Sequence, residues 1–255
     1  MSVGKKDAYE RDAKIMIRIT GDIHTHIGRL LKIIDESSHG DVIIQLGDAG
    51  LNLMNYYNQY PGQDEENKST LNSAAEWKGV KLLFVYGNHE KRPSTIDSYR
   101  LIDFCDAQAY VEDKYPALVF LKDGDIYTIA GKICLILGGA YSTDKDKRLE
   151  GRDWWADEQP SQEIRDLAEM NIKKFGYKVD YVISHTCPKK YIPQNTTKAK
   201  ILEERDEYIT EEWLDELEEK LDDYRGWYCG HWHINETAPE NPRIHFLYND
   251  IEVLQ

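Results

Sequence analysis

The segment KIMIRITGDIH, residues 14–24, carries the main evidence for the fold class of this 255-residue chain. Its first part, Lys14–Thr20, is an apolar and β-branched run, which predicts a buried β-strand. Gly21 ends the run, and Asp22 and His24 follow it at once. In α/β folds, ligands bind in the crevice at the carboxyl ends of the strands. The stretch therefore predicts an α/β fold with a polar site at the end of its first strand.

The same arrangement returns four more times along the chain. Each time a strand-like run ends, and a side chain that can bind a metal follows. The runs are Val42–Leu46 before Asp48, Val80–Tyr86 before Asn88 and His89, Val179–Ser184 before His185, and Gly226–Cys229 before His231 and His233. Because strand ends converge, we expect these side chains to form one cluster. In extended backbone, residues two apart point to the same face, so both members of the Asp22/His24 and His231/His233 pairs would reach it.

The composition is that of an ordinary globular protein, with 41% hydrophobic and 31% charged residues. The formal net charge of −14 repels duplex backbones and anionic lipid, so it disfavours nucleic acid as a partner. It does not exclude an anionic substrate, because bound divalent ions dominate the charge inside a site. We expect one domain over residues 1–255, with residues 1–13 as a flexible N-terminal extension.

The sequence predicts a cytoplasmic protein that does not associate with membranes. Its polar N-terminus lacks the apolar core of a signal peptide, and no apolar run approaches the roughly 18 residues of a membrane helix. The cysteines are scattered without a CxxC pair, which favours free thiols in a reducing compartment. They are Cys105, Cys134, Cys187 and Cys229.

The remaining elements follow from periodicity and turn residues. Helical spacing marks Leu30–Ile34, Ser69–Trp77, Ser161–Phe175 and Thr210–Leu221, and short strands are expected over Ala117–Leu121, Asp125–Ala130, Lys132–Leu137, Ile244–Tyr248 and Ile251–Leu254. Asp123-Gly124 and Asn249-Asp250 predict hairpins between the strands that they separate. Asn52–Asn67 is expected to be a loop or an insertion, and Ser142–Pro160 a polar loop. The segments Leu51–Thr70 and Ser142–Pro160 are expected to shape a pocket.

Five short motifs occur in order: GDIH from Gly21, GD from Gly47, GNHE from Gly87, SH from Ser184 and GHWH from Gly230. In this the chain resembles the calcineurin-like metallophosphoesterase superfamily. The resemblance implies a four-layer α/β/β/α sandwich of two mixed β-sheets flanked by helices. It also implies two divalent metal ions: Asp22, His24 and His233 would hold one, Asn88, His185 and His231 the other, and Asp48 would bridge both.

The resemblance implies that the protein is a dinuclear metal-dependent hydrolase, with Asp48 and His89 as the catalytic residues. A hydroxide bridging the metals would attack a phosphomonoester or phosphodiester, and His89 would contact the phosphate or protonate the leaving group. A small phosphate ester or nucleotide is the favoured substrate. The mixture of imidazole, carboxylate and amide donors favours manganese, with iron, zinc or magnesium as alternatives.

Some residues depart from the family pattern, and others have two possible roles. No arginine follows Asp48, and Asn52 stands where a second aspartate is common, which disfavours a protein Ser/Thr phosphatase. Glu90 is expected to orient His89, and His26 to be exposed or to support the site. Lys91 and Arg92 could hold a second phosphate or be solvated. The aromatic side chains of the two loops are expected to pack rather than to stack on substrate; they are Tyr56, Tyr57, Tyr60, Trp154 and Trp155.

Three alternatives to a small-molecule esterase remain at this point. The first is a nuclease acting on DNA or RNA. The second is a non-catalytic protein-binding scaffold with the same fold, which the complete ligand set argues against. The third is a structural metal site, although such sites are usually closed shells, whereas this set leaves positions open. The substrate, the choice between mono- and diester, and the oligomeric state are not determined by the sequence.

Overall fold

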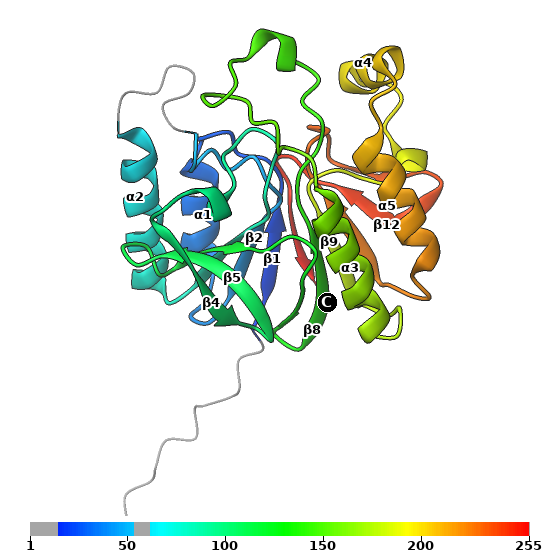
Figure 1. Ribbon diagram of the computed structural model, residues 1–255. Coiled ribbons are helices and arrows are strands. Elements are labelled where there is room, and N and C mark those ends of the chain that lie inside the picture. The colour runs from blue at the N-terminus through cyan, green and yellow to red at the C-terminus, as the bar shows by residue number, and fades with distance from the viewer. Residues whose placement is uncertain (1–14, 54–61, 255) are drawn as a thin grey trace, which may run out of the picture.

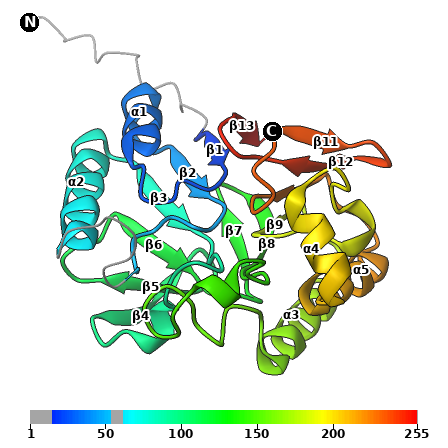
Figure 2. The ribbon, with the colours of Figure 1, turned by 90° about the horizontal axis from the view of Figure 1, so that it is seen from above.

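Four layers make up the protein in its computed structural model, which describes residues 15–53 and 62–254 (Figure 1). Two β-sheets face each other in the middle. Helices α1 (Gly28–Glu36) and α2 (Gln63–Lys78) cover the outer face of the first sheet, and α3 (Gln162–Lys174) and α5 (Ile209–Lys220) cover the second (Figure 2). The predicted α/β/β/α sandwich is therefore confirmed.

The first sheet has the order β13-β1-β2-β3-β6-β5-β4. Strands β1, β2, β3 and β6 run parallel in its centre, while antiparallel neighbours complete both edges. The strands are β1 (Ile17–Thr20), β2 (Val42–Gln45), β3 (Lys81–Phe84), β4 (Tyr99–Phe104), β5 (Ala107–Glu112), β6 (Leu118–Leu121) and β13 (Ile251–Leu254).

The second sheet has the order β11-β12-β10-β9-β8-β7 and is also mixed. Its parallel centre is β8, β9, β10 and β12, with β7 and β11 antiparallel at the edges. The strands are β7 (Ile126–Ile129), β8 (Lys132–Leu137), β9 (Tyr181–Ser184), β10 (Gly226–Cys229), β11 (Glu236–Ala238) and β12 (Asn241–Phe246). A further helix, α4 (Thr197–Arg205), stands above α5 in Figure 1.

The central strands are buried on both faces, which explains their continuous apolar runs. In β2, Ile44 packs between the sheets, whereas its neighbour Ile43 packs under α1 and α2. In β8, Ile136 faces the inter-sheet core and Leu135 faces the helices on the other side. Alternation with a period of two thus fills three apolar layers from strands that look uniformly hydrophobic in the sequence.

Both predicted hairpins are wrong, because the chain changes sheets at each of these turns. Asp123-Gly124 joins β6 of the first sheet to β7 of the second, and Asn249-Asp250 joins β12 of the second sheet to β13 of the first. Strand β13 instead pairs antiparallel with β1, where it completes the edge of the sheet. The turn before it is fixed by the Asn235 side chain, whose Oδ1 accepts the amide of Asn249 at 2.9 Å.

The predicted loop over Asn52–Asn67 is wrong in its second part, because α2 begins at Gln63. Gly62 precedes the helix with φ +91°, a left-handed conformation that favours glycine. Asp64, Glu65 and Glu66 follow in the first turn, where carboxylates interact favourably with the helix dipole. Periodicity also missed the β4–β5 hairpin, β11 and α4. The predictions for residues 1–13 and for Tyr56, Tyr57 and Tyr60 fall outside the described residues.

None of the helices within the described ranges is both long and apolar enough to cross a membrane. The parallel strands of both sheets end at the same side of the sandwich, which is the upper side in Figure 1. The loops after β1, β2, β3, β9 and β10 therefore meet there, which is the convergence that the sequence predicts.

Candidate metal centre

Asp22 lies fully buried at the centre of these loops, with 0% of its surface exposed. Its Oδ1 accepts a hydrogen bond from the His231 amide at 2.9 Å, which ties the first loop to the last. Its Oδ2 faces two imidazoles, 3.2 Å from His233 Nε2 and 3.7 Å from His24 Nε2. One carboxylate oxygen is therefore used by the backbone, and the other is directed at side chains that can bind a metal.

The two carboxylate oxygens of Asp48 have different surroundings, as those of Asp22 do. Oδ1 accepts the His89 amide at 2.9 Å, while Oδ2 is buried without a hydrogen-bond partner among the described residues. Three imidazole Nε2 atoms surround that oxygen at distances too long for hydrogen bonds: 3.6 Å for His185, 3.9 Å for His89 and 4.0 Å for His24. Burial would raise the pKa of Asp48, but the surrounding imidazoles hold it well below its usual range.

Asn88, His185 and His231 form the other half of the cluster. Asn88 Oδ1 lies 2.8 Å from His185 Nε2 and 3.1 Å from His231 Nδ1, and all three side chains are buried. His185 Nδ1 donates to the Leu46 carbonyl oxygen at 2.6 Å, so Nε2 is the ring nitrogen that faces the cluster. Among the residues that the structure describes, none bonds to the buried His231 Nε2.

Glycine is required where these loops touch. A Cβ at Gly47 would lie 2.4 Å from His185 Nδ1, and Gly47 has φ +90°. A Cβ at Gly230 would lie 2.2 Å from Asp22 Oδ1. The loops can approach His185 and Asp22 this closely only because glycine has no side chain.

The backbone is strained at the cluster itself. His24, Asp48, His231 and His233 all have positive φ, between 41° and 61°. Such conformations are uncommon outside glycine and cost of order 1–3 kcal/mol each, and they concentrate at functional sites. The prediction that the Asp22/His24 and His231/His233 pairs reach the cluster through extended backbone is therefore wrong. Left-handed turns direct these side chains inward instead.

The donors fit divalent metal ions. Two groups have ligand atoms that all lie within 4.8 Å of one another, namely Asp22, His24 and His233, and Asp22, Asp48 and His185. The unpartnered buried atoms Asp48 Oδ2 and His231 Nε2 support the same conclusion, because such atoms are costly unless something binds them. His24 Nε2 and His233 Nε2 lie 2.9 Å apart, so both ring nitrogens point to one position beside Asp22 that suits a bound cation.

Glu90 and Arg92 differ from their predicted roles. Glu90 Oε1 accepts the Ala49 amide at 3.3 Å, so it ties the loop after β2 to the loop after β3 rather than orienting His89. Arg92 is neither solvated nor directed at the site. It is buried, pairs with Asp123 and donates to the Asp157 carbonyl oxygen at 2.8 Å. His26 is exposed, as expected, and lies at the wall of the pocket.

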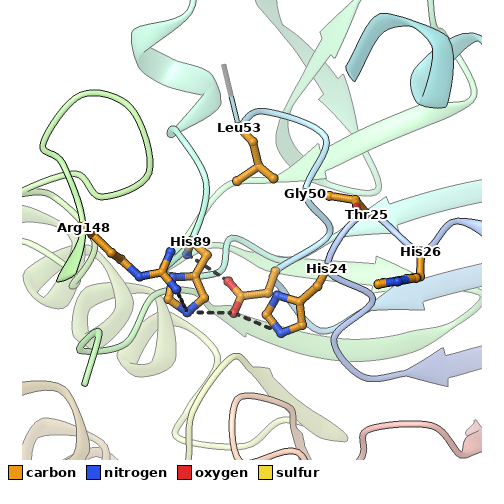
Figure 3. A pocket seen from close by; sticks show the side chains of 8 residues that line it. His24, Thr25, His26, Gly50, Leu53, His89 and Arg148 are labelled. Atoms are coloured by element: carbon orange, nitrogen blue, oxygen red, sulfur yellow. Dashed lines mark hydrogen bonds and ion pairs between the residues drawn. The ribbon is translucent and has the colours of Figure 1, made fainter. Parts of the chain in front are cut away.

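A pocket of about 260 Å³ opens over the cluster, as Figure 3 shows. His24, Asp48 and His89 form its floor, and Thr25, Gly50 and Leu53 line one side. Burial lowers the pKa of the His89 imidazole to about 3, so the ring is neutral near pH 7. Its Nε2 therefore accepts from Arg148 Nη2, which lies 3.3 Å away at the opposite wall.

Sequence reasoning missed two cations, Arg148 and Lys198. Arg148 lies in the predicted Ser142–Pro160 loop, and Lys198 in α4 donates its Nζ hydrogen to the His231 carbonyl oxygen. Burial lowers the pKa of the Lys198 ammonium, although Asp22 and Asp48 oppose this. The only signal for Arg148 was its place in a loop that was expected to shape the pocket. Nothing in the periodicity marked Lys198.

The fold and the donor set define a metal-binding α/β sandwich protein. The chain belongs to the calcineurin-like phosphoesterase family, whose model matches residues 15–235. Membership implies a metal-dependent hydrolase of phosphate esters that uses divalent ions. Eighteen chains of solved structures match, among them a crystal structure with TM-score 0.50 and 13% identity, which covers 94% of this chain and 98% of the other. At that identity the likeness shows the fold alone. Among curated proteins, none matches the chain.

We predict that Gly230→Ala weakens Mn²⁺ binding at least about tenfold, the size of effect that changes beside metal ligands produce. The added Cβ would displace Asp22 Oδ1. Calorimetric titration with Mn²⁺ measures the affinity, and a melting curve checks the fold. Gly28→Ala is the matched control, because a Cβ there meets nothing within 4 Å. Equal affinity in wild type and Gly230→Ala would contradict a metal role for Asp22.

Behind the cluster, Glu211 in α5 is 0% exposed. Its Oε1 accepts from Thr186 Oγ1 at 2.9 Å, and its Oε2 has no hydrogen-bond partner within the described part of the chain. Burial raises the pKa of this carboxyl from 4.5 to about 7. The folded state therefore binds the proton more tightly than the unfolded state does. Glu211 therefore lowers the unfolding free energy as pH rises from 4.5 to about 7, and above that range the loss is complete.

We predict that Glu211→Gln removes this pH dependence. Between about pH 4 and pH 8, wild type should lose about 3 kcal/mol of unfolding free energy relative to the variant, because each pKa unit corresponds to about 1.4 kcal/mol. Urea denaturation of metal-free protein measures the difference at each pH. Glu216→Gln, exposed on the same helix, is the control. A constant difference between wild type and Glu211→Gln across this range would show that Glu211 does not titrate in the fold.

Proposed function

We propose that the protein is a dinuclear phosphoesterase that hydrolyses a small phosphate ester or a nucleotide. The observation that carries this proposal is the surrounding of Asp48 Oδ2. A buried carboxylate oxygen with imidazole nitrogens of His24, His89 and His185 between 3.6 and 4.0 Å away suits a shared metal ligand. Family membership supplies the reaction class.

The proposed ligand sets follow the two halves of the cluster. Asp22, His24 and His233 would hold one ion, and Asn88, His185 and His231 the other. Asp48 would contact both. When bound, two such ions supply Lewis acidity toward the phosphoryl oxygens and a nucleophilic water near neutral pH. The mixture of imidazole, carboxylate and amide donors favours manganese, with iron, zinc or magnesium as alternatives.

The chain's own groups position the substrate. The pocket of about 260 Å³ suits a phosphoryl group with a small leaving group, which Thr25 and Leu53 would contact at the wall. The net charge of −14 disfavours a long nucleic acid, so a nuclease is the second candidate. The cysteines are free thiols, which fits a cytoplasmic protein.

His89 has two proposed tasks at its Nε2 atom. In the neutral ring, Nε2 accepts from Arg148, which holds this atom beside the position proposed for the phosphate. A phosphate dianion beside it would raise the pKa of the imidazole, because an opposite charge favours the protonated form. The protonated Nε2 could then deliver its proton to the departing alkoxide oxygen.

We predict that the Mn²⁺-loaded protein hydrolyses at least one of p-nitrophenyl phosphate, bis(p-nitrophenyl) phosphate and cyclic nucleotides. Asp48→Asn should lower kcat/KM at least about 100-fold, since it removes the shared anionic ligand. Asp113→Asn, an exposed carboxylate in the Arg100 ion pair, should leave activity unchanged.

Two outcomes would overturn the assignment. Absence of turnover on every ester, with Mn²⁺ demonstrably bound, would exclude these substrate classes. Full activity in Asp48→Asn would exclude the proposed centre. If the protein bound a partner equally well with or without Asp48, the scaffold alternative would be favoured instead.

We predict that the effect of His89→Asn depends on the leaving group. If Nε2 donates the proton, the loss on phenyl phosphate should reach about 100-fold, the usual contribution of a general acid. The loss on p-nitrophenyl phosphate should be much smaller, because that leaving group departs without protonation. Steady-state kcat/KM on the two substrates measures this. Equal losses would assign His89 to phosphate binding only.

A further inference from the structure

Arg148 belongs to the segment between β8 and α3, which rises over the strand ends in Figure 1. Only 8% of its side chain is exposed, although the segment itself is at the surface. It lines the same pocket as His24, Asp48 and His89, and Figure 3 shows its guanidinium beside the His89 ring. A buried arginine at a pocket wall needs an explanation, because removing this charge from water is costly.

The guanidinium is held in one orientation. Its Nε lies 2.7 Å from Asp144 Oδ1 and its Nη2 lies 2.7 Å from Asp144 Oδ2, a bidentate ion pair. Its Nη1 donates to the Asp153 carbonyl oxygen at 3.1 Å. These contacts leave Nη2 also directed at the floor of the pocket, 3.3 Å from His89 Nε2.

The segment that carries Arg148 is anchored at its base. Glu158 Oε1 accepts the Ser142 amide at 3.1 Å, and the buried Arg92 donates to the Asp157 carbonyl oxygen. Ser142 Oγ in turn accepts from Asn88 Nδ2 at 2.7 Å. The position of Arg148 is therefore tied to the cluster through hydrogen bonds, which is the preorganisation that recognition of a charged group needs.

We propose that Arg148, together with His89, binds the third non-bridging oxygen of a phosphoryl group, so that the site prefers phosphomonoesters to phosphodiesters. This inference rests on the proposed phosphoesterase function. A monoester carries three non-bridging oxygens, whereas a diester carries two and an ester oxygen in the third position. A guanidinium at the pocket wall forms a charge-assisted hydrogen bond with the third anionic oxygen of a monoester. Beside the neutral ester oxygen of a diester, it loses its hydration and gains no charged partner.

The alternative is that Arg148 has only a structural role, in which its ion pair with Asp144 stabilises the segment between β8 and α3. The two readings differ in what the variants change. A fastening role would alter stability and affect both ester types equally. A binding role would affect the monoester and inorganic phosphate selectively, and Asp144 would then be a positioning residue that acts through Arg148.

The test compares p-nitrophenyl phosphate with bis(p-nitrophenyl) phosphate, which have the same leaving group. In Mn²⁺-loaded Arg148→Gln, kcat/KM on the monoester should fall about 100-fold, the usual loss of one charge-stabilising donor. The loss on the diester should stay within about threefold, because no charged partner is removed there. The Ki of inorganic phosphate should rise about tenfold or more, as a charged hydrogen bond is lost. Arg148→Lys should restore only part of the monoester rate, because it lacks the planar fork.

Arg152→Gln is the matched control. Arg152 lies in the same segment and pairs with Asp153, but its side chain is 57% exposed and it does not line the pocket. It should leave both substrates unaffected. Asp144→Asn should reproduce a smaller part of the Arg148→Gln defect, and the double variant should be no worse than Arg148→Gln alone.

The outcomes separate the two proposals. If wild type with Mn²⁺ bound hydrolyses neither of these esters nor cyclic nucleotides, the proposed function fails. If wild type is active and Arg148→Gln keeps its monoester rate and phosphate Ki, only the role of Arg148 fails. Equal losses on monoester and diester, with a lowered Tm, would assign Arg148 to fastening its segment and would also overturn the inference.

Discussion

Two buried carboxylates, Asp22 and Asp48, impose the constraint on which the upper end of the sandwich depends. With 0% and 1% exposure they cannot be solvated, so the fold must supply their partners. It does so in the same way twice: one oxygen takes a backbone amide from a loop of another strand, and the other oxygen faces imidazoles. These amide bonds fasten the loops to one another, and the loops come from both sheets. The bond to Asp22 joins a loop of the second sheet to a loop of the first, whereas the bond to Asp48 joins two loops of the first sheet. Asp22 therefore links the two sheets at this end, and both carboxylates belong to the cluster.

The same constraint accounts for the strained backbone. Positive φ at His24, Asp48, His231 and His233 costs free energy that these residues would avoid in isolation. The cost is accepted because the left-handed turns direct imidazoles and amides at the carboxylates within hydrogen-bond or near-contact distance. Gly47 and Gly230 serve the same end by leaving room for the neighbouring side chain. Strain and charge at the centre thus have one cause, namely the need to bring cationic or donor groups against buried anions.

Charge at the site is separate from charge on the whole chain. The protein carries a formal net charge of −14, yet its pocket is bordered by Arg148, while Lys198 contacts the loop that carries His231. Both cations come from segments that cover the strand ends and not from the strands themselves. The strand ends therefore present the carboxylate, amide and imidazole donors, and the covering segments add the cations near the pocket. Variation among relatives in substrate would be expected to lie in those segments.

The sequence alone determined the central strands and the side chains that gather at their ends, because these depend on local signals: apolar runs, glycine and the polar residue that follows. The layer architecture followed from the resemblance of the five motifs to a known family. The tertiary structure was needed to show where the chain changes sheets, since Asp123-Gly124 and Asn249-Asp250 carry the local signature of hairpins, whereas β7 lies in a different sheet from β6 and β13 in a different sheet from β12. It also decided that Glu90 ties loops together, that Arg92 is buried against Asp123, and that Arg148 reaches His89 from a loop. Each of these depends on contacts between residues distant in sequence, and periodicity carries no information about such contacts.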